Sequence, residues 1–171
     1  MSNISDMKFT SLLTVTVLCA TLGSALAADE NDNLAGAALC IDNNSFTADI
    51  GSLGATSKVV SQALYDYFAS RVAAKHIKVD ELGKGQCTDY WVGLDFGATE
   101  GTPRAWYGEI SLWDYSAYAS TNASSKYKQP VSVWNSSYYG ALENSRGLAD
   151  YLIDQGKGII DEFLVAYAKV N

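Results

Sequence analysis

The chain is 171 residues long and acidic, with a formal net charge of −7 at pH 7. This charge disfavours nucleic acids and anionic membrane surfaces as partners, because both are negatively charged as well. Charged residues make up 18% of the chain and hydrophobic residues 48%, and there are only two prolines. That composition is typical of one folded domain and excludes a disordered chain.

The N-terminus has the three-part pattern of a secretory signal peptide. Lys8 supplies a short positive region, residues 12–22 form an uncharged and largely apolar run, and Ala25 and Ala27 are small residues at the −3 and −1 positions of a cleavage site. The apolar run is too short to span a bilayer, which takes about 20 apolar residues. We therefore expect residues 1–27 to be removed on export, leaving a periplasmic or secreted protein that does not span the membrane.

Two details of this segment bear on processing. The residues before Met7 include Asp6 and add nothing to the signal, so we expect Met7 to be the true start. A lipid anchor on Cys19 is the alternative to simple cleavage. Leu18 precedes that cysteine, however, where a lipoprotein signal has glycine or alanine, so we expect Cys19 to be discarded with the signal.

The elements of the first half follow from hydrophobic spacing. We expect a flexible acidic lead-in over residues 28–35 and a single domain over residues 36–171. The apolar run 36–41 predicts a strand, because turn-forming residues follow it. Residues 45–54 are polar and rich in turn formers, and we expect no regular element there. An amphipathic helix follows, with its apolar residues at Val60, Leu64, Tyr67, Phe68 and Val72.

Either Thr56 or Ser57 can cap this helix. After it, residues 76–79 predict a brief strand. Residues 89–96 and 104–115 then alternate between apolar and other positions, and the glycine- and proline-containing segment between them predicts a hairpin.

A strand from residue 131 towards residue 139 follows, and Asn144 or Ser145 caps the last helix. Gly156 and Gly158 lie inside that helix, where each costs about 1 kcal/mol relative to alanine. Its apolar residues nevertheless form a clear stripe: Leu148, Leu152, Ile159, Ile160, Phe163, Leu164 and Tyr167.

This order of elements predicts an α+β fold. Consecutive strands joined by hairpins pair antiparallel, and both helices can cover the same face of the sheet. We therefore expect a two-layer sandwich, with a mainly antiparallel sheet of four to five strands and two helices on one face.

Removal of the signal would leave Cys40 and Cys87 as the cysteines of the mature chain. An even count in an oxidising compartment favours a disulfide, although two free buried thiols are the alternative. The bridge would close a loop of roughly 48 residues and stabilise the fold by about 4 kcal/mol in the chain-entropy model. His76 is the only histidine, so we expect no metal site, and no motif indicates a cofactor.

Three segments carry a resemblance to a known group of proteins. They are an acidic and aromatic strand start at residues 89–94, the strand at residues 109–112, and a valine- and tryptophan-containing strand at residues 131–134 that leads into the terminal helix. Their order resembles small periplasmic domains of bacterial envelope assembly, including ABC-transporter auxiliary lipoproteins, the lipoprotein of the lipopolysaccharide translocon and the N-terminal domain of the Tol-system β-propeller protein. The resemblance implies a non-catalytic envelope domain that holds other components. This chain departs from the group in lacking a lipobox and a second domain and in having an internal cysteine pair.

The alternation of the hairpin strands predicts an open, aromatic sheet face. The apolar residues of both strands should lie under the helices. The opposite face should then carry Trp91, Tyr107, Trp113, Tyr115 and Trp134. Exposed aromatic side chains are typical of interaction surfaces, so we expect this face to bind an envelope protein, a second copy of the chain, a glycan or a lipid. The alternatives are that the loop 117–129 covers the face, or that the register is wrong by one residue.

Two carboxylates leave an enzymatic alternative open. Asp95 and Glu109 lie on the same predicted face of neighbouring strands, and a carboxylate pair can serve a glycosidase. Such pairs beside aromatic rings also occur on sugar-binding surfaces, and ordinary solvated strand residues explain them as well. His76 lies beside Lys75 at a helix end, where a solvated or structural role is expected.

The sequence therefore predicts an exported, non-catalytic binding or accessory protein of the bacterial envelope that acts through the aromatic sheet face. A glycan-acting enzyme using Asp95 and Glu109 is one alternative. A self-associating structural protein, such as a homodimer, is the other.

Overall fold

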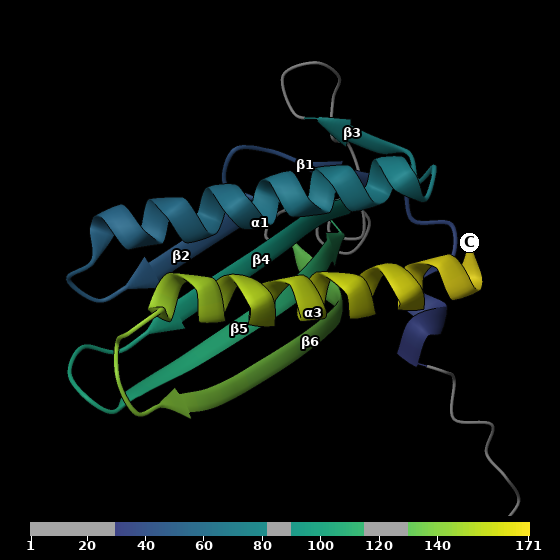
Figure 1. Cartoon of the computed structure of the whole chain (residues 1–171). Helices are drawn as coiled ribbons and strands as arrows, with labels where there is room; N and C mark the ends of the chain where they lie inside the picture. The colour runs from purple at the N-terminus through teal and green to yellow at the C-terminus, as the bar shows by residue number, and fades with distance from the viewer. Residues whose placement is uncertain (1–29, 82–89, 115–129) are drawn as a thin grey trace, which may run out of the picture.

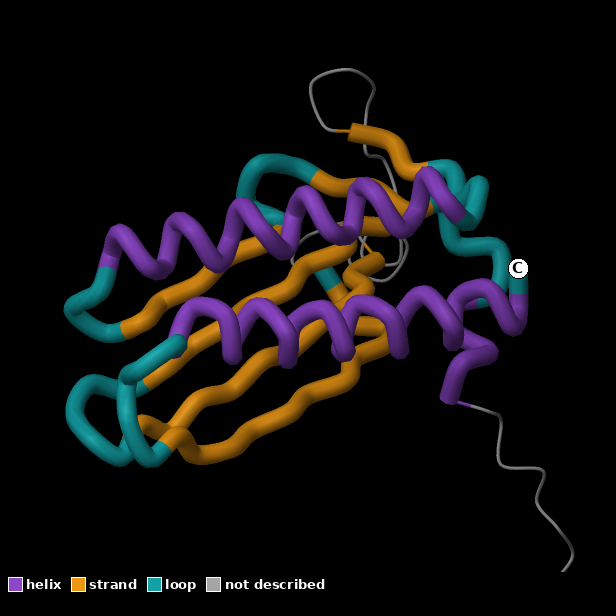
Figure 2. Tube along the Cα trace, in the orientation of Figure 1, coloured by secondary structure: helices purple, strands orange, loops and turns teal. Residues whose placement is uncertain are grey.

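Two long helices lie side by side across one face of a mixed β-sheet, as Figures 1 and 2 show. The computed structural model describes residues 30–81, 90–114 and 130–171. The helices are α1 (Gly54–Ala74) and α3 (Leu148–Val170). The expected α+β architecture, with these two helices on one face, is confirmed.

The sheet differs from the expected one in size and in strand direction. The described residues form six strands: β1 (Leu39–Ile41), β2 (Phe46–Ile50), β3 (Val79–Glu81), β4 (Tyr90–Ala98), β5 (Arg104–Asp114) and β6 (Val131–Leu142). The order is β3-β1-β4-β5-β6, and β2 also pairs with β4. The pairs among β4, β5 and β6 are antiparallel, as expected, whereas β1 pairs parallel to β3 and β4, and β2 parallel to β4. Parallel pairing arises because α1 serves as a crossover between strands.

Strand β2 is a correction, because we expected no regular element over residues 45–54. Phe46 and Ile50 are buried in the core, and the ring of Phe46 packs against that of Phe68 in α1 at a centroid distance of 5.1 Å. Thr47 and Asp49 alternate with them and are exposed. The strand contains polar residues because one of its faces is open.

The hairpin of β4 and β5 follows the predicted alternation. Val92, Leu94, Ile110 and Leu112 are buried beneath the helices. Register partners across the two strands include Asp95 with Glu109 and Trp91 with Trp113.

Trp134 lies on the opposite face from the one expected, and this part of the prediction is wrong. It pairs with Leu112 in the register of β5 and β6, is only 8% exposed, and packs against Phe163 of α3 at a centroid distance of 5.3 Å. A register shift follows at once, because Trp113 pairs with Ser132. The face of Trp134 is set by this long-range pairing with β5, which a single strand sequence does not reveal.

The element ends also differ from the predicted ones. Helix α1 begins at Gly54, and Ser57 lies within its first turns, where its Oγ donates to the Leu53 carbonyl oxygen. The predicted strand over residues 76–79 is shifted. His76 has a left-handed φ of 56°, which does not fit a strand, and β3 begins only at Val79. Helix α3 begins after Gly147, which has a φ of 67°, rather than at Asn144 or Ser145.

The two helices approach each other closely at one glycine. A Cβ on Gly156 would lie 2.5 Å from Cδ2 of Leu64, so the absence of a side chain lets α3 pack on α1 there. An ion pair between Arg71 Nε and Asp161 Oδ1 at 2.7 Å also joins the helices, and the Tyr67 hydroxyl donates to Asp161 Oδ2 at 2.8 Å. Neither α1 nor any other described helix has the length and apolar character needed to cross a lipid bilayer.

The N-terminal part of the described chain packs against the domain through Leu34 and Asn33. A 3-10 helix, η1 (Glu30–Leu34), falls in the segment expected to be a flexible lead-in. Leu34 is fully buried, and Asn33 Nδ2 donates to the Val133 carbonyl oxygen of β6 at 3.0 Å. The predicted signal peptide, residues 1–27, lies outside the described residues.

Cys40 lies in β1 and is buried. Cys87, its predicted partner, lies outside the described residues. The pairing of these two cysteines therefore stays a prediction.

Candidate functional site

The open face of the sheet carries a hollow of about 480 Å³. Strands β2, β4 and β5 form its floor. The residues that give it its chemical character are Thr47, Trp91, Asp95, Tyr107, Glu109 and Trp113. Five of these were predicted as binding residues from the sequence, and the structure brings those five together in one hollow.

Glycines in β4 shape this hollow. On the open face, β4 alternates Trp91, Gly93, Asp95 and Gly97. A Cβ on Gly93 would lie 2.6 Å from Cζ3 of Trp91, and one on Gly97 would lie 2.2 Å from Cε1 of Tyr107. The two rings therefore rest against the backbone of the sheet at the glycines, since any side chain there would displace them. Glycine within a strand commonly marks such a close approach.

The two carboxylates of the hollow are held by neutral donors. Asp95 accepts a hydrogen bond from Thr47 Oγ1 at 2.6 Å and another from the Tyr107 hydroxyl at 3.1 Å. Glu109 accepts one from Ser111 Oγ at 2.9 Å. Among the described residues that line the hollow there is no lysine, arginine or histidine. The described lining therefore leaves the charge of the carboxylates uncompensated.

Tyr107 reports this negative environment. Its pKa is raised above the ordinary value, first by burial and then by the charge of Asp95 and the hydrogen bond to it. The charges of Asp49 and Glu109 contribute in the same direction. Asp49 pairs with Gly97 in the register of β2 and β4, which brings a third carboxylate to this face. These described carboxylates would repel an anionic ligand but not a neutral or positively charged one.

Not all predicted binding residues join this site. Trp134 is buried on the other face, against α3. Tyr115 and the loop 117–129 lie outside the described residues, so the expectation that this loop covers the face stays untested. Sequence reasoning missed Thr47, because β2 was not predicted, and it missed the role of Gly93 and Gly97. The sequence does contain a signal for the two glycines, because both fall on the predicted open face of this strand beside aromatic residues.

Other parts of the described surface are less suited to a specific ligand. A larger hollow, of about 710 Å³, lies between β2 and α1 and is lined by residues such as Lys58, Gln62 and Tyr65. It contains no cluster of aromatic faces and carboxylates. Within the described ranges, no group of three or more histidine, cysteine, aspartate or glutamate residues is placed to hold a metal ion.

Comparison with known proteins places this chain in no family. No family model matches the sequence, and no curated protein matches it. Among solved structures, the chain is similar to one described as the PelC dodecamer from Paraburkholderia phytofirmans, with a TM-score of 0.40 and 12% sequence identity. The match covers 75% of this chain and 86% of that chain. Similarity at this level supports no conclusion about the function of this chain.

Proposed function

We propose that this chain is an exported, non-catalytic binding protein of the bacterial envelope that holds a neutral or positively charged glycan in the hollow on its open sheet face. The observation that carries the proposal is the convergence of Trp91, Tyr107 and Trp113 with two carboxylates in one hollow. Export is supported by the signal-peptide pattern of residues 1–27. The envelope location is supported by the resemblance in element order to periplasmic domains.

The side chains of the hollow suit a sugar. The ring of Trp91 rests on Gly93 and that of Tyr107 on Gly97, so both rings are held against the floor of the hollow, where a sugar ring can contact them. Asp95 and Glu109 add carboxylate oxygens, which accept hydrogen bonds from hydroxyl or amino groups. A few fixed polar groups within an apolar hollow are the usual composition of a ligand site.

The same geometry favours binding over hydrolysis. Asp95 and Glu109 are direct register partners on neighbouring strands, so both rise from the floor of the hollow on the same side of any ligand. Glycosidases instead place their two carboxyl groups so that they flank the scissile bond. Both oxygens of Asp95 already accept hydrogen bonds within the protein. The alternative of a glycan-acting enzyme rests only on the closeness of this pair.

The first test is ligand capture by the mature chain, residues 28–171. Native mass spectrometry of protein gently purified from its host's envelope would reveal a co-purifying glycan, and a glycan array would then define its class. We expect neutral and amino-bearing glycans to bind and sulfated or uronic-acid glycans not to bind. Trp91→Ala and Trp113→Ala should each weaken binding by about tenfold or more, as loss of a central aromatic contact does.

A control separates the hollow from the rest of the surface. Tyr138 is a partly exposed aromatic residue of β6 that contacts Glu162 of α3, so Tyr138→Ala should leave unchanged the binding of a short glycan that fills a single hollow. The proposal fails if no glycan binds, or if Trp91 and Trp113 prove to be covered by the chain's own loop. Cleavage of a bound glycan that the double variant Asp95→Asn, Glu109→Gln abolishes would establish the enzyme instead.

A further inference from the structure

The described sheet ends in edge strands of very different character. On one side lie β3, with three residues, and β2, with five. On the other side lies β6, with 12 residues, and no described element covers the outer side of most of it in Figure 1. An edge strand presents unpaired backbone N–H and C=O groups, which can pair with a strand of another chain.

Charge protects the short edges but not β6. Two of the three residues of β3 are Asp80 and Glu81, and β2 contains Asp49. Strand β6 reads Val-Ser-Val-Trp-Asn-Ser-Ser-Tyr-Tyr-Gly-Ala-Leu and contains no charged residue and no proline. Proteins that must keep an edge unpaired usually place lysine, proline or an inward charge on it, and β6 has none of these.

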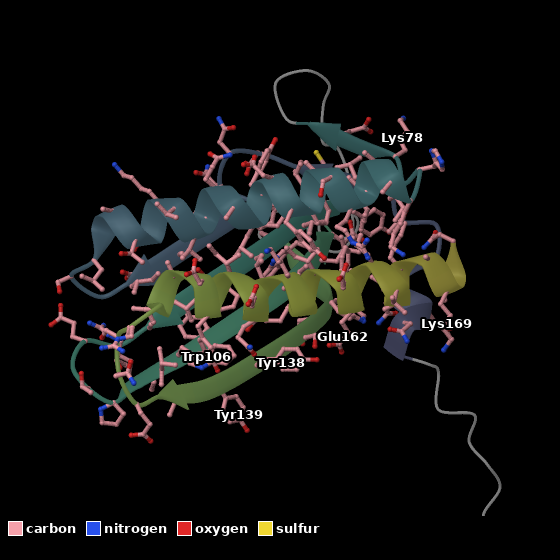
Figure 3. All side chains as sticks on the ribbon, viewed as in Figure 1. Lys78, Trp106, Tyr138, Tyr139, Glu162 and Lys169 are labelled. Carbon is pink, nitrogen blue, oxygen red and sulfur yellow. The ribbon has the colours of Figure 1, made fainter. Side chains whose placement is uncertain are left out.

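Exposed hydrophobic residues also gather on β6. Of the described large hydrophobic residues with high exposure, three belong to this strand: Val131, Tyr138 and Tyr139. Tyr139 is 87% exposed, and Figure 3 shows it projecting beyond β6, while Tyr138 lies next to Glu162 of α3. Asn33 of η1 binds the Val133 carbonyl oxygen near the start of the strand. Residues 135–142 are therefore the part of the edge that no described element covers (Figure 1).

We propose that two copies of this chain pair through β6, edge to edge and antiparallel, within residues 135–142 and centred on Tyr139. An antiparallel pair of identical strands is related by a twofold axis, so each segment meets its own sequence. The residue at the axis is then Tyr139, which is 87% exposed, so the two copies of this aromatic side chain meet across the pair. Because the chain carries a net charge of −7, two copies approach most easily where neither presents a carboxylate.

The pairing has a consequence for the hollow. A twofold axis perpendicular to the joined sheet keeps both open faces on the same side, so the two hollows would face the same way. A polymeric glycan could then occupy both, and its apparent affinity would rise through the high effective concentration of the second site. Only this consequence rests on the proposed function, since the pairing itself stands on the edge strand alone.

The test is the molar mass of residues 28–171 in solution, measured by analytical ultracentrifugation across a wide range of protein concentrations. We expect a concentration-dependent equilibrium between monomer and dimer. Tyr139→Lys brings two positive charges together across the twofold axis, so it should weaken association by about tenfold or more. Ser52→Lys adds the same charge at an exposed turn away from β6 and should leave association unchanged.

Hydrogen exchange supplies a second readout that does not depend on a variant. The outward backbone amides of residues 135–142 should exchange slowly at high concentration, where dimer dominates, and quickly at low concentration. The proposal is overturned if the wild-type chain is monomeric at every concentration, or if a folded Tyr139→Lys variant dimerises as strongly as the wild type. It is also overturned if β6 proves to pair with a strand of a different protein. Glycan binding by a strict monomer would leave the proposed function intact.

Discussion

The ring of Tyr107 lies so close to Gly97 that a Cβ on this glycine would be 2.2 Å from Tyr107 Cε1. Gly97→Ala must therefore push the ring away from the sheet. Tyr107 is 47% exposed, so the ring can swing outward without disrupting the core. Alanine is also favoured over glycine in a strand by about 0.5–1 kcal/mol. We expect the free energy of unfolding to change by no more than about 1 kcal/mol, while binding in the hollow is lost or strongly weakened.

Chemical denaturation and a titration with the captured glycan measure these two effects. Gly54→Ala is the control, because a Cβ on Gly54 would meet no atom within 4 Å and the residue lies away from the hollow. A Gly97→Ala variant that binds as the wild type does would show that the position of the Tyr107 ring is not needed for binding.

The raised pKa of Tyr107 predicts how the hollow responds to alkali. A raised pKa means that folding favours the neutral phenol, so the stabilisation is fully present below the ordinary tyrosine pKa of about 10 and is lost as the pH rises through the higher, folded-state value. Burial is the largest cause, and the charge of Asp95 is the next. Asp95→Asn should therefore lower the pKa of Tyr107 towards its ordinary value without restoring it fully.

NMR titration of ring-labelled tyrosine measures this pKa directly, and Tyr107→Phe assigns the signal. Asp150→Asn is a suitable control, because Asp150 is an exposed residue at the start of α3 and does not act on Tyr107. An unchanged Tyr107 pKa in Asp95→Asn would contradict the contact between the two side chains.

The two glycines inside α3 should respond in opposite ways to alanine. Gly156 packs against the fully buried Leu64, and a Cβ there would lie 2.5 Å from Leu64 Cδ2, so Gly156→Ala overpacks the contact between the helices. Such overpacking typically costs about 1–3 kcal/mol of stability. Gly158 is exposed, and a Cβ there would meet nothing within 4 Å, so Gly158→Ala should stabilise the helix by about 0.5–1 kcal/mol.

Thermal or urea unfolding of the two variants against the wild type checks this pair. The decisive quantity is the sign of each variant's change in the free energy of unfolding, since both variants make the same chemical change in the same helix. Equal stabilisation by both would mean that the helices do not meet at Gly156.

Features that depend on residues close together in the chain could be predicted from the sequence, whereas features that depend on contacts between distant residues could not. The stripe of α1, from Val60 to Val72, and the alternation around Leu94 and Ile110 are local patterns, and both predict the buried faces correctly. From this alternation alone, the five residues of the hollow could be placed on one face. Gly156 was predicted only as a defect of its helix, because its partner Leu64 is distant in the chain.

The errors concern pairings between distant segments. Strand β2 is recognisable only beside β4, which buries Phe46 and Ile50 and leaves the polar residues on the open face. Trp134 was placed on the wrong face because its side is set by pairing with Leu112 and by the register shift that follows. The position of β6 at the edge of the described sheet likewise becomes known only with the strand order.

The predicted disulfide between Cys40 and Cys87 has a direct chemical test. Reduction should make the intact mature protein heavier by the mass of two hydrogens, and neither thiol should react with a labelling reagent before reduction. Because Cys40 is buried in β1, loss of the predicted bond would both remove the cross-link and leave a thiol within the sheet. Cys87→Ser should lower the free energy of unfolding by about 2–4 kcal/mol, as the loss of a disulfide that closes a loop of this length does.

A double variant tests whether the two cysteines are bonded to each other. If they are, Cys40→Ser, Cys87→Ser should lose about as much stability as Cys87→Ser alone, apart from the effect of placing serine at the buried Cys40 position. Additive losses, or a free thiol at Cys87 in the unreduced protein, would exclude the bridge.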